Sequence, residues 1–334
     1  MSVLDTLRRP LANLRLSVTD RCNLRCAYCM PEEEYVWLPS PDVLTFEELS
    51  ALVDRFMALG VRRVRLTGGE PLVRRDLHVL VRMLAAKGLE DLALTTNGVL
   101  LADQAAALRE AGLHRVTVSL DTLRSDRFVR LTKRDQLSAV LKGISVARFP
   151  GRLKLDTVVM RGVNDDELLE LAAFAREHDA ELRFIEYMDV GGATKWSMGD
   201  VVPAREIAER LGAHEVVAGR GSAPAERFRL ANGQIVGIIG STTQPFCSAC
   251  DRSRLTADGR FFTCLYATRG VDLKRMLRAG ASSEELERLM RETWERRSDR
   301  GAEERLALRE KRGPMLSAAE LKSQPHLEMH TRGG

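Results

Sequence analysis

Three cysteines stand close together near the start of the chain, and their spacing points to a metal cofactor. Gaps of three and two residues separate Cys22, Cys26 and Cys29 within the stretch RCNLRCAYCMP. This spacing does not match the cysteine pairs of a zinc finger, and three thiolates on a four-iron cubane leave one iron without a protein ligand. The sequence therefore predicts an iron-sulfur cluster whose open iron can bind a further molecule.

The other three cysteines form a second set far along the chain. Gaps of two and thirteen residues separate Cys247, Cys250 and Cys264. Taken alone, this set could be a zinc site that lacks one ligand. However, no cysteine is left over to complete it, and no histidine stands at ligand spacing beside it, the nearest preceding one being His214. We therefore interpret the set as a second three-thiolate cluster with one open iron.

Six strand-like runs alternate with helical patterns in the first part of the chain. The runs lie at 14–18, 62–67, 92–96, 115–120, 154–160 and 182–188. Helices are expected between them, for example at 45–59, 74–87 and 165–178, and capping signals begin at Thr45 and Asn164. Repeated strand-helix units predict a parallel sheet covered by helices, and six units are too few for a closed eight-stranded barrel.

Several of these strands alternate polar and apolar residues, whereas parallel strands buried on both faces are nearly continuously apolar. The polar residues that share one face of a strand are Arg15, Ser17 and Thr19; Arg63, Arg65 and Thr67; Thr117 and Ser119; and Lys154 and Asp156. A solvated sheet edge would explain any one of these strands. A partly open barrel with a wide polar interior explains all four, and it would carry its active groups at the carboxyl ends of the strands.

Two of the predicted strands end in glycine-containing motifs. The second leads into Gly68-Gly69-Glu70-Pro71, where paired glycines let the backbone approach a ligand closely. The third ends in Thr95-Thr96-Asn97-Gly98, which alone is only a turn signal. Both motifs would lie at the end of the barrel where the active groups are expected.

The pattern changes after the sixth strand. A short helix at about 204–211 precedes a hairpin that turns at Asn232-Gly233, and a second turn at Asp258-Gly259 follows Cys250. From 298 onward the chain is rich in arginine and lacks apolar periodicity. We therefore predict a partial barrel at 1–195, a domain for the second cluster at 196–297, and a flexible tail at 298–334 that ends in Gly-Gly.

The composition is that of a globular protein. Of the 334 residues, 44% are hydrophobic and 29% are charged. The 51 basic and 47 acidic residues are interspersed and give a net charge of +4, which does not indicate nucleic acid as a partner. Since no apolar run approaches about 20 residues and the N-terminus lacks the apolar segment of a signal peptide, we expect a cytoplasmic protein that does not insert into membranes. In that reducing compartment the cysteines are expected to be ligands rather than disulfides.

The segments CNLRCAYC, LTGGEP, TTNG and CSACDRSRLTADGRFFTCLY, in this order, resemble the GTP 3',8-cyclases of molybdenum-cofactor biosynthesis, which are radical S-adenosylmethionine (SAM) enzymes. The resemblance extends over residues 11–279 and the terminal diglycine. It implies an α/β fold, namely a partial (β/α)6 TIM-type barrel with a C-terminal extension for an auxiliary cluster. It also implies two 4Fe-4S clusters, one that binds SAM and one that binds the guanine of GTP.

The resemblance implies a role for each matching position. Cys22, Cys26 and Cys29 would hold the SAM cluster, and Cys247, Cys250 and Cys264 the auxiliary cluster. The positions implied to surround SAM are Tyr28, Gly69, Ser119 and Met188. Those implied to contact GTP are Arg15, Arg65, Thr96, Lys154, Arg252, Ser253 and Arg254. Convergent arginines suit a triphosphate because each guanidinium can donate two parallel hydrogen bonds to phosphate oxygens.

The implied reaction begins when the reduced cluster cleaves SAM to methionine and a 5'-deoxyadenosyl radical. This radical removes hydrogen from C3' of GTP, C3' attacks C8, and reduction gives 3',8-cyclo-7,8-dihydro-GTP. An external one-electron donor and the downstream cyclic pyranopterin monophosphate synthase are the implied partners, and members of the family often form homodimers. The diglycine, Gly333 and Gly334, is implied to reach the active site as catalytic residues, although Arg332 stands where the family commonly has an apolar residue.

Two other classes of protein fit this sequence less well. A peptide-modifying radical SAM enzyme with an auxiliary cluster usually carries more auxiliary cysteines and a peptide-recognition domain, and neither is present in the pattern. A non-catalytic iron-sulfur or zinc protein that binds RNA would need a basic surface interleaved with aromatics, but aromatics make up only 5% of the chain.

Overall fold

The computed structural model describes residues 2–333, and its core is one twelve-stranded sheet. The strands are β1 (Asn13–Ser17), β2 (Arg63–Thr67), β3 (Asp91–Thr96), β4 (Arg115–Ser119), β5 (Lys154–Val159), β6 (Glu181–Glu186), β7 (Glu215–Val217), β8 (Glu226–Arg229), β9 (Ile235–Ile239), β10 (Arg252–Leu255), β11 (Arg260–Phe262) and β12 (Val271–Asp272). Their order in the sheet is β12-β11-β10-β1-β2-β3-β4-β5-β6-β9-β8-β7.

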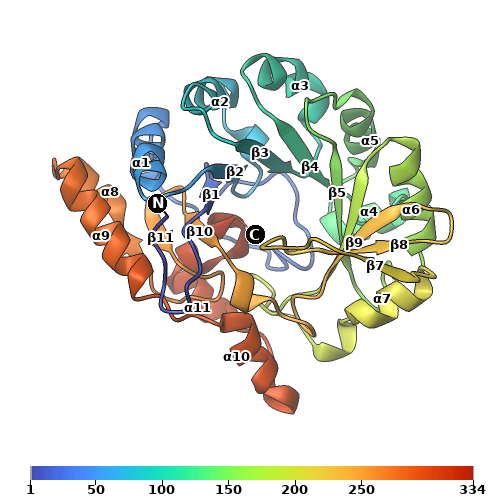
Figure 1. The fold of residues 1–334 in the computed structure, drawn as a ribbon. Helices are drawn as coiled ribbons and strands as arrows, with labels where there is room; N and C mark the ends of the chain where they lie inside the picture. Colours follow the sequence, from blue (N-terminus) through green and yellow to red (C-terminus); the bar gives the residue numbers. More distant parts are fainter. Residues whose placement is uncertain (1, 334) are drawn as a thin grey trace.

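The sheet curls into an open barrel (Figure 1). Strands β1 to β6 pair in parallel, β10 pairs in parallel with β1, and β9 pairs in parallel with β6. Because β9 and β10 stand at the two ends of this parallel run, the barrel does not close. The predicted partial (β/α)6 barrel is confirmed. The C-terminal extension adds strands to both edges of the same sheet, with β7, β8, β11 and β12 antiparallel to their neighbours.

Helices surround the sheet: most of them cover its outer face, and the last one contacts β1 from the inner side (Figure 1). They are α1 (Phe46–Ala58), α2 (Leu77–Ala85), α3 (Leu101–Glu110), α4 (Ser125–Thr132), α5 (Leu137–Val146), α6 (Leu168–Glu177), α7 (Ala204–Arg210), α8 (Leu273–Arg278), α9 (Ser283–Glu295), α10 (Gly301–Ala307), α11 (Ala318–Ser323) and α12 (Met329–Arg332). Apolar residues of the strands, such as Leu16, Leu66 and Leu94, pack against these helices and are fully buried. No helix within residues 2–333 is long and apolar enough to cross a membrane.

Of the two capping signals, one is confirmed and one is wrong. Thr45 caps α1, since its Oγ1 accepts a hydrogen bond from Glu48 N and its backbone N donates to Glu48 Oε2. Helix α6 begins only at Leu168, without a side-chain cap. Asn164 instead donates to the carbonyls of Asp121 and Val158, at 2.9 and 2.8 Å, so its side chain closes the loop after β5 rather than the first turn of a helix.

The polar strand faces turn inward, as predicted, at the carboxyl ends of the strands. Arg15, Arg65, Thr67, Ser119 and Asp156 line an internal cavity. At the amino ends the prediction is wrong for Arg63, whose side chain is half exposed and lies 3.7 Å from Glu90. Alternation along a strand decides which face of the sheet a side chain occupies. Its position along the strand decides whether it lies inside the barrel or at the rim.

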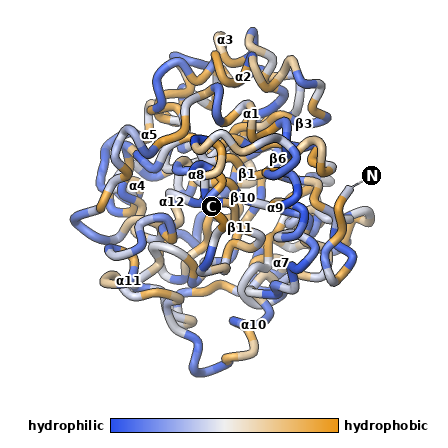
Figure 2. The backbone as a smooth tube through the Cα atoms, turned by 90° about the vertical axis from the view of Figure 1, so that its left-hand side faces the viewer, coloured by the Kyte–Doolittle hydropathy of each residue, from blue (hydrophilic) through white to orange (hydrophobic). Residues whose placement is uncertain are grey.

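The final segment differs from the flexible, solvated tail that the sequence suggested. It forms α10, α11 and α12, and Leu321 and Leu327 are buried against Phe262 of β11. Figure 1 shows the red end of this segment within the curl of the sheet, beside β10, and Figure 2, turned by 90°, shows α12 near β1 and β10. The boundaries at 195 and 297 stay a prediction.

Candidate active site

One cavity of about 350 Å³ lies inside the barrel at the carboxyl ends of the parallel strands. All six cysteines line it, although more than 200 residues separate the two sets in the sequence. The pairing of β10 with β1 explains this meeting, because it places the strand after Cys250 beside the strand before Cys22. The two predicted cysteine sites are therefore walls of the same chamber.

The loop that follows β1 carries the first set. Backbone hydrogen bonds from Cys29 N and Met30 N to Cys26 O, at 2.9 and 2.7 Å, form a tight turn. Arg25 N and Ala27 N donate to carbonyls of α4 and attach this loop to the barrel. Burial raises the pKa of the Cys22 thiol to about 11 and the pKa values of Cys26 and Cys29 as well. These thiols are therefore protonated in the absence of metal. A bound metal, which needs thiolate ligands, would itself provide the positive charge that stabilises them.

The second set differs from the first at one cysteine, Cys250. Cys247 begins a single 3-10 turn, η4 (Cys247–Ala249), Cys250 follows it, and Cys264 follows β11. Burial alone would raise the pKa of Cys250, but the charges of Arg252 and Arg297 outweigh it and lower that pKa to about 7. Burial raises the pKa values of Cys247 and Cys264, so the electropositive environment acts on Cys250 in particular.

The residues present fit two iron-sulfur clusters. All six thiols are free and partly buried, and each set of three shares one part of the cavity wall. Within residues 2–333, no three His, Cys, Asp or Glu side chains converge on the position of a single metal ion. A cubane needs no such convergence, because each thiolate binds a different iron. The donor set, sulfur only and three per site, also leaves one iron open at each.

Five guanidinium groups line the cavity, and they come from β1, β2, β6 and β10. They are Arg15, Arg65, Arg183, Arg252 and Arg254. Burial, together with repulsion from neighbouring arginines, lowers the pKa of Arg15 to about 9 and that of Arg254 to about 10. The other charges are carboxylates such as Asp156, which lies 2.8 Å from Arg183 but without hydrogen-bond alignment. A polyanion bound here would relieve this crowding of positive charge.

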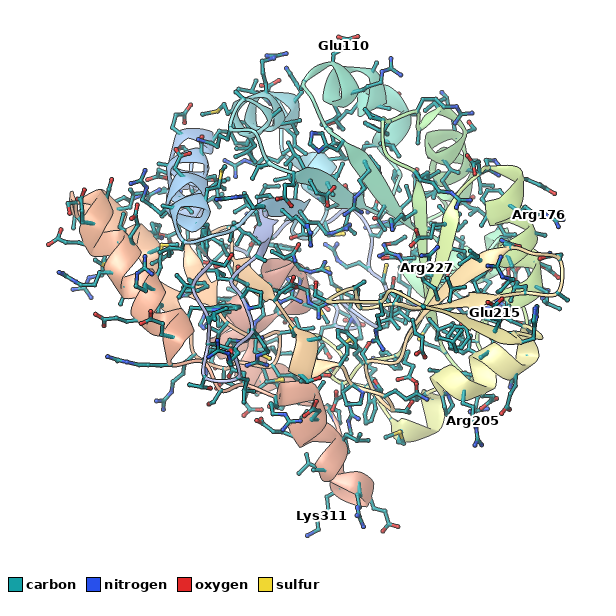
Figure 3. The ribbon with its side chains drawn as sticks, viewed as in Figure 1. Glu110, Arg176, Arg205, Glu215, Arg227 and Lys311 are labelled. Atoms are coloured by element: carbon teal, nitrogen blue, oxygen red, sulfur yellow. The ribbon has the colours of Figure 1, made fainter. Side chains whose placement is uncertain are left out.

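Charged side chains on the outer helices point into solvent instead. Figure 3 shows Glu110, Arg176 and Lys311 on outer elements, pointing away from the barrel, and all three are exposed. The arginines of the cavity therefore differ from these in being turned towards the inside of the barrel.

The four positions predicted around SAM all line the cavity: Tyr28, Gly69, Ser119 and Met188. Tyr28 donates from its hydroxyl to Asp121 Oδ2 at 2.8 Å. At Gly69 a Cβ atom would lie only 2.2 Å from the carbonyl oxygen of Arg21, so a larger residue would push the two loops apart. Gly69 thus allows the loop after β2 to contact the loop that carries the first cysteine set.

The predicted GTP positions divide into two groups. Arg15, Arg65, Thr96, Arg252 and Arg254 line the cavity. The other two are not among its lining residues. Lys154 binds both carboxylate oxygens of Glu181 at 2.8 Å, and Ser253 donates to Asn13 O at 3.0 Å from a fully buried position.

The end of the chain enters this chamber. Gly333 has φ +68°, and Arg254 donates to its carbonyl oxygen. Arg332 is 1% exposed, donates to Leu265 O at 2.6 Å and lies over the ring of Phe262 at 4.6 Å. An arginine in place of an apolar residue is thus accommodated by an aromatic face and a free carbonyl. Gly334, the last predicted site residue, lies outside the described residues.

Among the lining residues that were not predicted are Arg183, Asp121 and His330. Alternation along β6 could have identified Arg183, because it shares a face with Ile185, which also lines the cavity. Asp121 follows β4, and nothing in the sequence signals its hydrogen bond to Tyr28. For His330 the sequence offers no signal, because only the docking of α12 brings it to the cavity.

Comparisons with known proteins agree with this geometry. Residues 16–175 match the model of the Radical SAM superfamily, and residues 180–303 match that of Molybdenum Cofactor Synthesis C. The chain is 53% identical to GTP 3',8-cyclase 1 of Mycobacterium tuberculosis, over 99% of this chain and 95% of the relative. It is 50% identical to GTP 3',8-cyclase of Acidothermus cellulolyticus, over 90% and 87%.

A solved structure shares the fold. The chain resembles Streptococcus suis SuiB bound to S-adenosylmethionine with a TM-score of 0.59 and 16% identity, covering 85% of this chain and 68% of that one. At this identity the likeness concerns the fold alone, which is the open α/β barrel described above.

Proposed function

This chain belongs to the GTP 3',8-cyclases, a family of radical SAM enzymes, and on that premise we propose that it converts GTP to (8S)-3',8-cyclo-7,8-dihydroguanosine 5'-triphosphate, the first step of molybdopterin biosynthesis. The observation that carries the proposal is the cavity that both cysteine sets share and that five arginines also line. A substrate held there would lie next to SAM at one end and next to a second cluster at the other.

We assign the first cysteine set, Cys22, Cys26 and Cys29, to the 4Fe-4S cluster that binds SAM. Its chemistry, when bound and reduced, is the cleavage of SAM to methionine and a 5'-deoxyadenosyl radical. Tyr28, Gly69, Ser119 and Met188 would surround SAM. Abstraction of the 3' hydrogen of GTP and attack of C3' on C8 would follow in the same cavity, with an external donor supplying electrons.

The arginines would bind and orient the substrate. Arg65 donates to the hydroxyls of Thr95 and Thr117, at 3.0 and 2.9 Å, so its guanidinium is held in place before any ligand arrives. Arg15 and Arg254, on the paired strands β1 and β10, lie side by side in register. Together these groups can grip a triphosphate from one side, which fixes the ribose and base relative to the two cysteine sets.

The protein would also exclude water from the reaction. Gly333 and the helix α12 lie against the cavity wall, and Arg254 holds the end of the chain there. A closed chamber protects a reactive carbon radical from side reactions. Gly333 lies at this closure, and we assign Gly333 and Gly334 to the catalytic site as its terminal diglycine.

Turnover under anaerobic conditions tests the proposal. We would reconstitute the protein, add dithionite, SAM and GTP, and quantify 5'-deoxyadenosine and the cyclised nucleotide by mass spectrometry. We expect both products, in equal amounts and dependent on GTP. Formation of 5'-deoxyadenosine without any conversion of GTP would show that the substrate assignment is wrong and would favour a peptide-modifying radical SAM enzyme.

Iron and sulfide analysis tests the number of clusters. We expect about eight irons and eight sulfides per chain, as two 4Fe-4S clusters require. Cys26→Ala and Cys264→Ala should each lower both values to about half, since they remove a ligand from different clusters. If Cys264→Ala leaves the iron content unchanged, or zinc replaces iron at that set, the second cluster is not present.

The position in the pathway is proposed on the same basis. The product would be consumed by a cyclic pyranopterin monophosphate synthase. The family resemblance also suggests a homodimer, which sedimentation equilibrium would test.

A further inference from the structure

A buried charged cluster lies behind the second cysteine set, on the side away from the cavity centre, and it comes from the two ends of the chain. Arg9 and Asp5 belong to the N-terminal turn, and Arg297 follows α9. Their side chains are 2%, 0% and 1% exposed. We call this trio the Arg9–Asp5–Arg297 cluster.

Both arginines bind the backbone of the turn that carries two of the cysteines. Arg9 Nη1 donates to Cys247 O at 2.9 Å, and Arg297 Nη1 donates to Cys250 O at 2.8 Å. Cys247 O also accepts from Cys250 N at 3.2 Å, which closes the turn. The two guanidinium groups therefore hold both ends of η4 and fix the direction in which its thiols point.

The cluster is itself held rigidly. Asp5 accepts from Arg9 Nε at 2.6 Å and from Arg9 N at 2.8 Å, and it lies 3.5 Å from Arg297 Nη1. Trp294 donates to Arg9 O at 3.1 Å, and the guanidinium of Arg297 lies 4.4 Å from its ring centre. Because each group has a fixed partner, small movements of the turn would break several contacts at once.

The charges of the cluster do not cancel. Two guanidinium cations face one fully buried carboxylate, and Asp299, whose side chain is 32% exposed, lies 3.9 Å from Arg297 Nε. Within residues 2–333, Arg9 Nη2 and Arg297 Nε are buried without a hydrogen-bond acceptor. Asp299 is partly screened by water, so among the buried groups one positive charge is left over, next to the backbone of Cys247 and Cys250.

We propose that Arg9 and Arg297 are positioning residues for the second iron-sulfur cluster, and that their surplus positive charge raises its reduction potential. The inference rests on the proposed function, since it needs a cluster on Cys247, Cys250 and Cys264. Reduction adds a negative charge to the cluster, and a nearby buried cation stabilises that charge. Residues beyond the ligands also orient the ligands themselves.

The test isolates the second cluster in the full-length chain. A parent variant with Cys22→Ala, Cys26→Ala and Cys29→Ala keeps only the second cysteine set. After anaerobic reconstitution, iron and sulfide are measured per chain, and the midpoint potential is determined by a redox titration followed by electron paramagnetic resonance, without SAM or GTP. The substitutions Arg297→Met, Arg297→Lys and Asp5→Asn are then compared with the parent.

Opposite shifts are expected for opposite changes of charge. Arg297→Met should lower the ratio of reduced to oxidised cluster about tenfold at the parent's midpoint, a shift of about 59 mV for one electron. Arg297→Lys keeps the charge and should stay near the parent. Asp5→Asn removes the counter-charge and should shift the potential the other way.

Arg74→Met is the matched control. Arg74 is also a partly buried arginine that donates to two backbone carbonyls, those of Val18 and Leu44, both at 2.6 Å, but it is not part of the second cysteine site. It should lower the thermal stability without moving the potential. Loss of iron from Arg297→Met at a melting temperature similar to that of Arg74→Met would support the positioning role.

The outcomes separate the two proposals. If the parent binds neither iron nor sulfide, the assignment of a second cluster is wrong, and the inference is wrong with it. If the parent holds the cluster but Arg297→Met and Asp5→Asn leave both its content and its potential unchanged, the inference is overturned while the second cluster stands. Should Arg297→Met fail to fold, the direction of the Asp5→Asn shift decides.

Discussion

Arg254 donates a hydrogen bond of 2.5 Å from Nη1 to the carbonyl oxygen of Gly333. This contact joins β10, the strand after Cys250, to Gly333, which stands 79 residues later in the chain. The same nitrogen lies 3.2 Å from Arg332 O, so one cavity arginine binds two successive carbonyls of the tail. Arg254 is also one of the arginines that we propose bind GTP, so we expect the order of the tail to change when the cavity is occupied.

We expect Gly333→Ala to abolish cyclisation while both clusters and GTP binding remain. A Cβ at Gly333 would lie 1.9 Å from Thr67 Oγ1, so the tail could not dock as it does. Gly162→Ala is the matched control, because Gly162 has nearly the same φ, +69°, but no atom within 4 Å of its Cβ position. Product formation by both variants is measured with iron content and GTP affinity. Normal turnover in Gly333→Ala would contradict the role of the docked tail.

We expect Arg332→Met to loosen the tail without unfolding the barrel. The methionine keeps packing against Phe262 but removes the donor to Leu265 O, and a buried carbonyl without a partner costs about 1–3 kcal/mol. Hydrogen exchange of residues 325–333 should therefore accelerate about tenfold or more. Arg309→Met changes an exposed arginine of the same tail and should leave the exchange unaltered. Equal exchange in the two variants would show that Arg332 does not hold the tail.

His330 by itself should weaken the docking of α12 in acid. Burial, followed by the charge of Arg25, lowers the pKa of this histidine from 6.5 to about 3. The ring packs edge-on against Tyr35 and Trp37, and neither of its nitrogens has a hydrogen-bond partner within residues 2–333. At His330 the docked state therefore binds fewer protons than the undocked state. The contribution of neutral His330 is fully present above pH 6.5, and by itself it should fall by about tenfold per pH unit below that value. Burial raises the pKa of Glu328 to about 7, so its protonation favours docking in the same pH range and opposes the effect of His330.

Hydrogen exchange of the tail between pH 7.5 and 5, corrected for the intrinsic rate, measures this dependence. Other titratable groups lie near His330: Arg25 and Tyr35 in the N-terminal loops, and Glu328 and Arg332 in the tail. These residues are kept in both of the proteins that are compared. His330→Phe keeps the aromatic packing and removes the titration of His330 but not that of Glu328, so its tail should exchange more slowly as the pH falls from 7.5 to 5, whereas the unsubstituted tail should not. The same pH dependence in both proteins would exclude His330 as the cause.

Asp189 should be the main anchor of the segment that precedes the tail. It accepts from Arg312 Nε and Nη2, both at 2.8 Å, from Arg305 Nε at 2.7 Å and from the hydroxyl of Tyr266 at 3.0 Å. Burial alone would raise the pKa of Asp189, but these arginines outweigh it and lower the pKa. Removing one partner of a buried ion pair costs about 3–5 kcal/mol.

Asp189→Ala should therefore lower the free energy of unfolding by about that amount, as measured in urea. Glu209→Ala is the control, because Glu209 also pairs with an arginine, 3.3 Å from Arg205 Nε, but its side chain is 64% exposed and the pair is screened by water. We expect no resolvable change there. A similar loss in both variants would mean that the buried network adds nothing beyond a surface ion pair.

The sequence by itself determined the chemistry of the cysteines and much of the barrel. Cys22, Cys26 and Cys29 are close in the chain, so their spacing alone limits the metal that they can bind. Strand parity likewise placed Arg15 and Arg65 on an inner face, because neighbouring side chains on a strand alternate whatever the rest of the fold does. The capping box at Thr45 and the hairpin turn at Asn232-Gly233 were also local, and both are confirmed.

Only the tertiary structure decided which of these parts meet. Cys22 and Cys250 lie on one cavity because β10 pairs with β1, and such a pairing between distant segments leaves no periodic signal in either of them. The tail shows the same limit, since Arg332 lies in a polar stretch and is nevertheless buried on Phe262. Side chains such as His330 and Arg297 acquire their roles from contacts across more than 200 residues, and local patterns carry no information about those contacts.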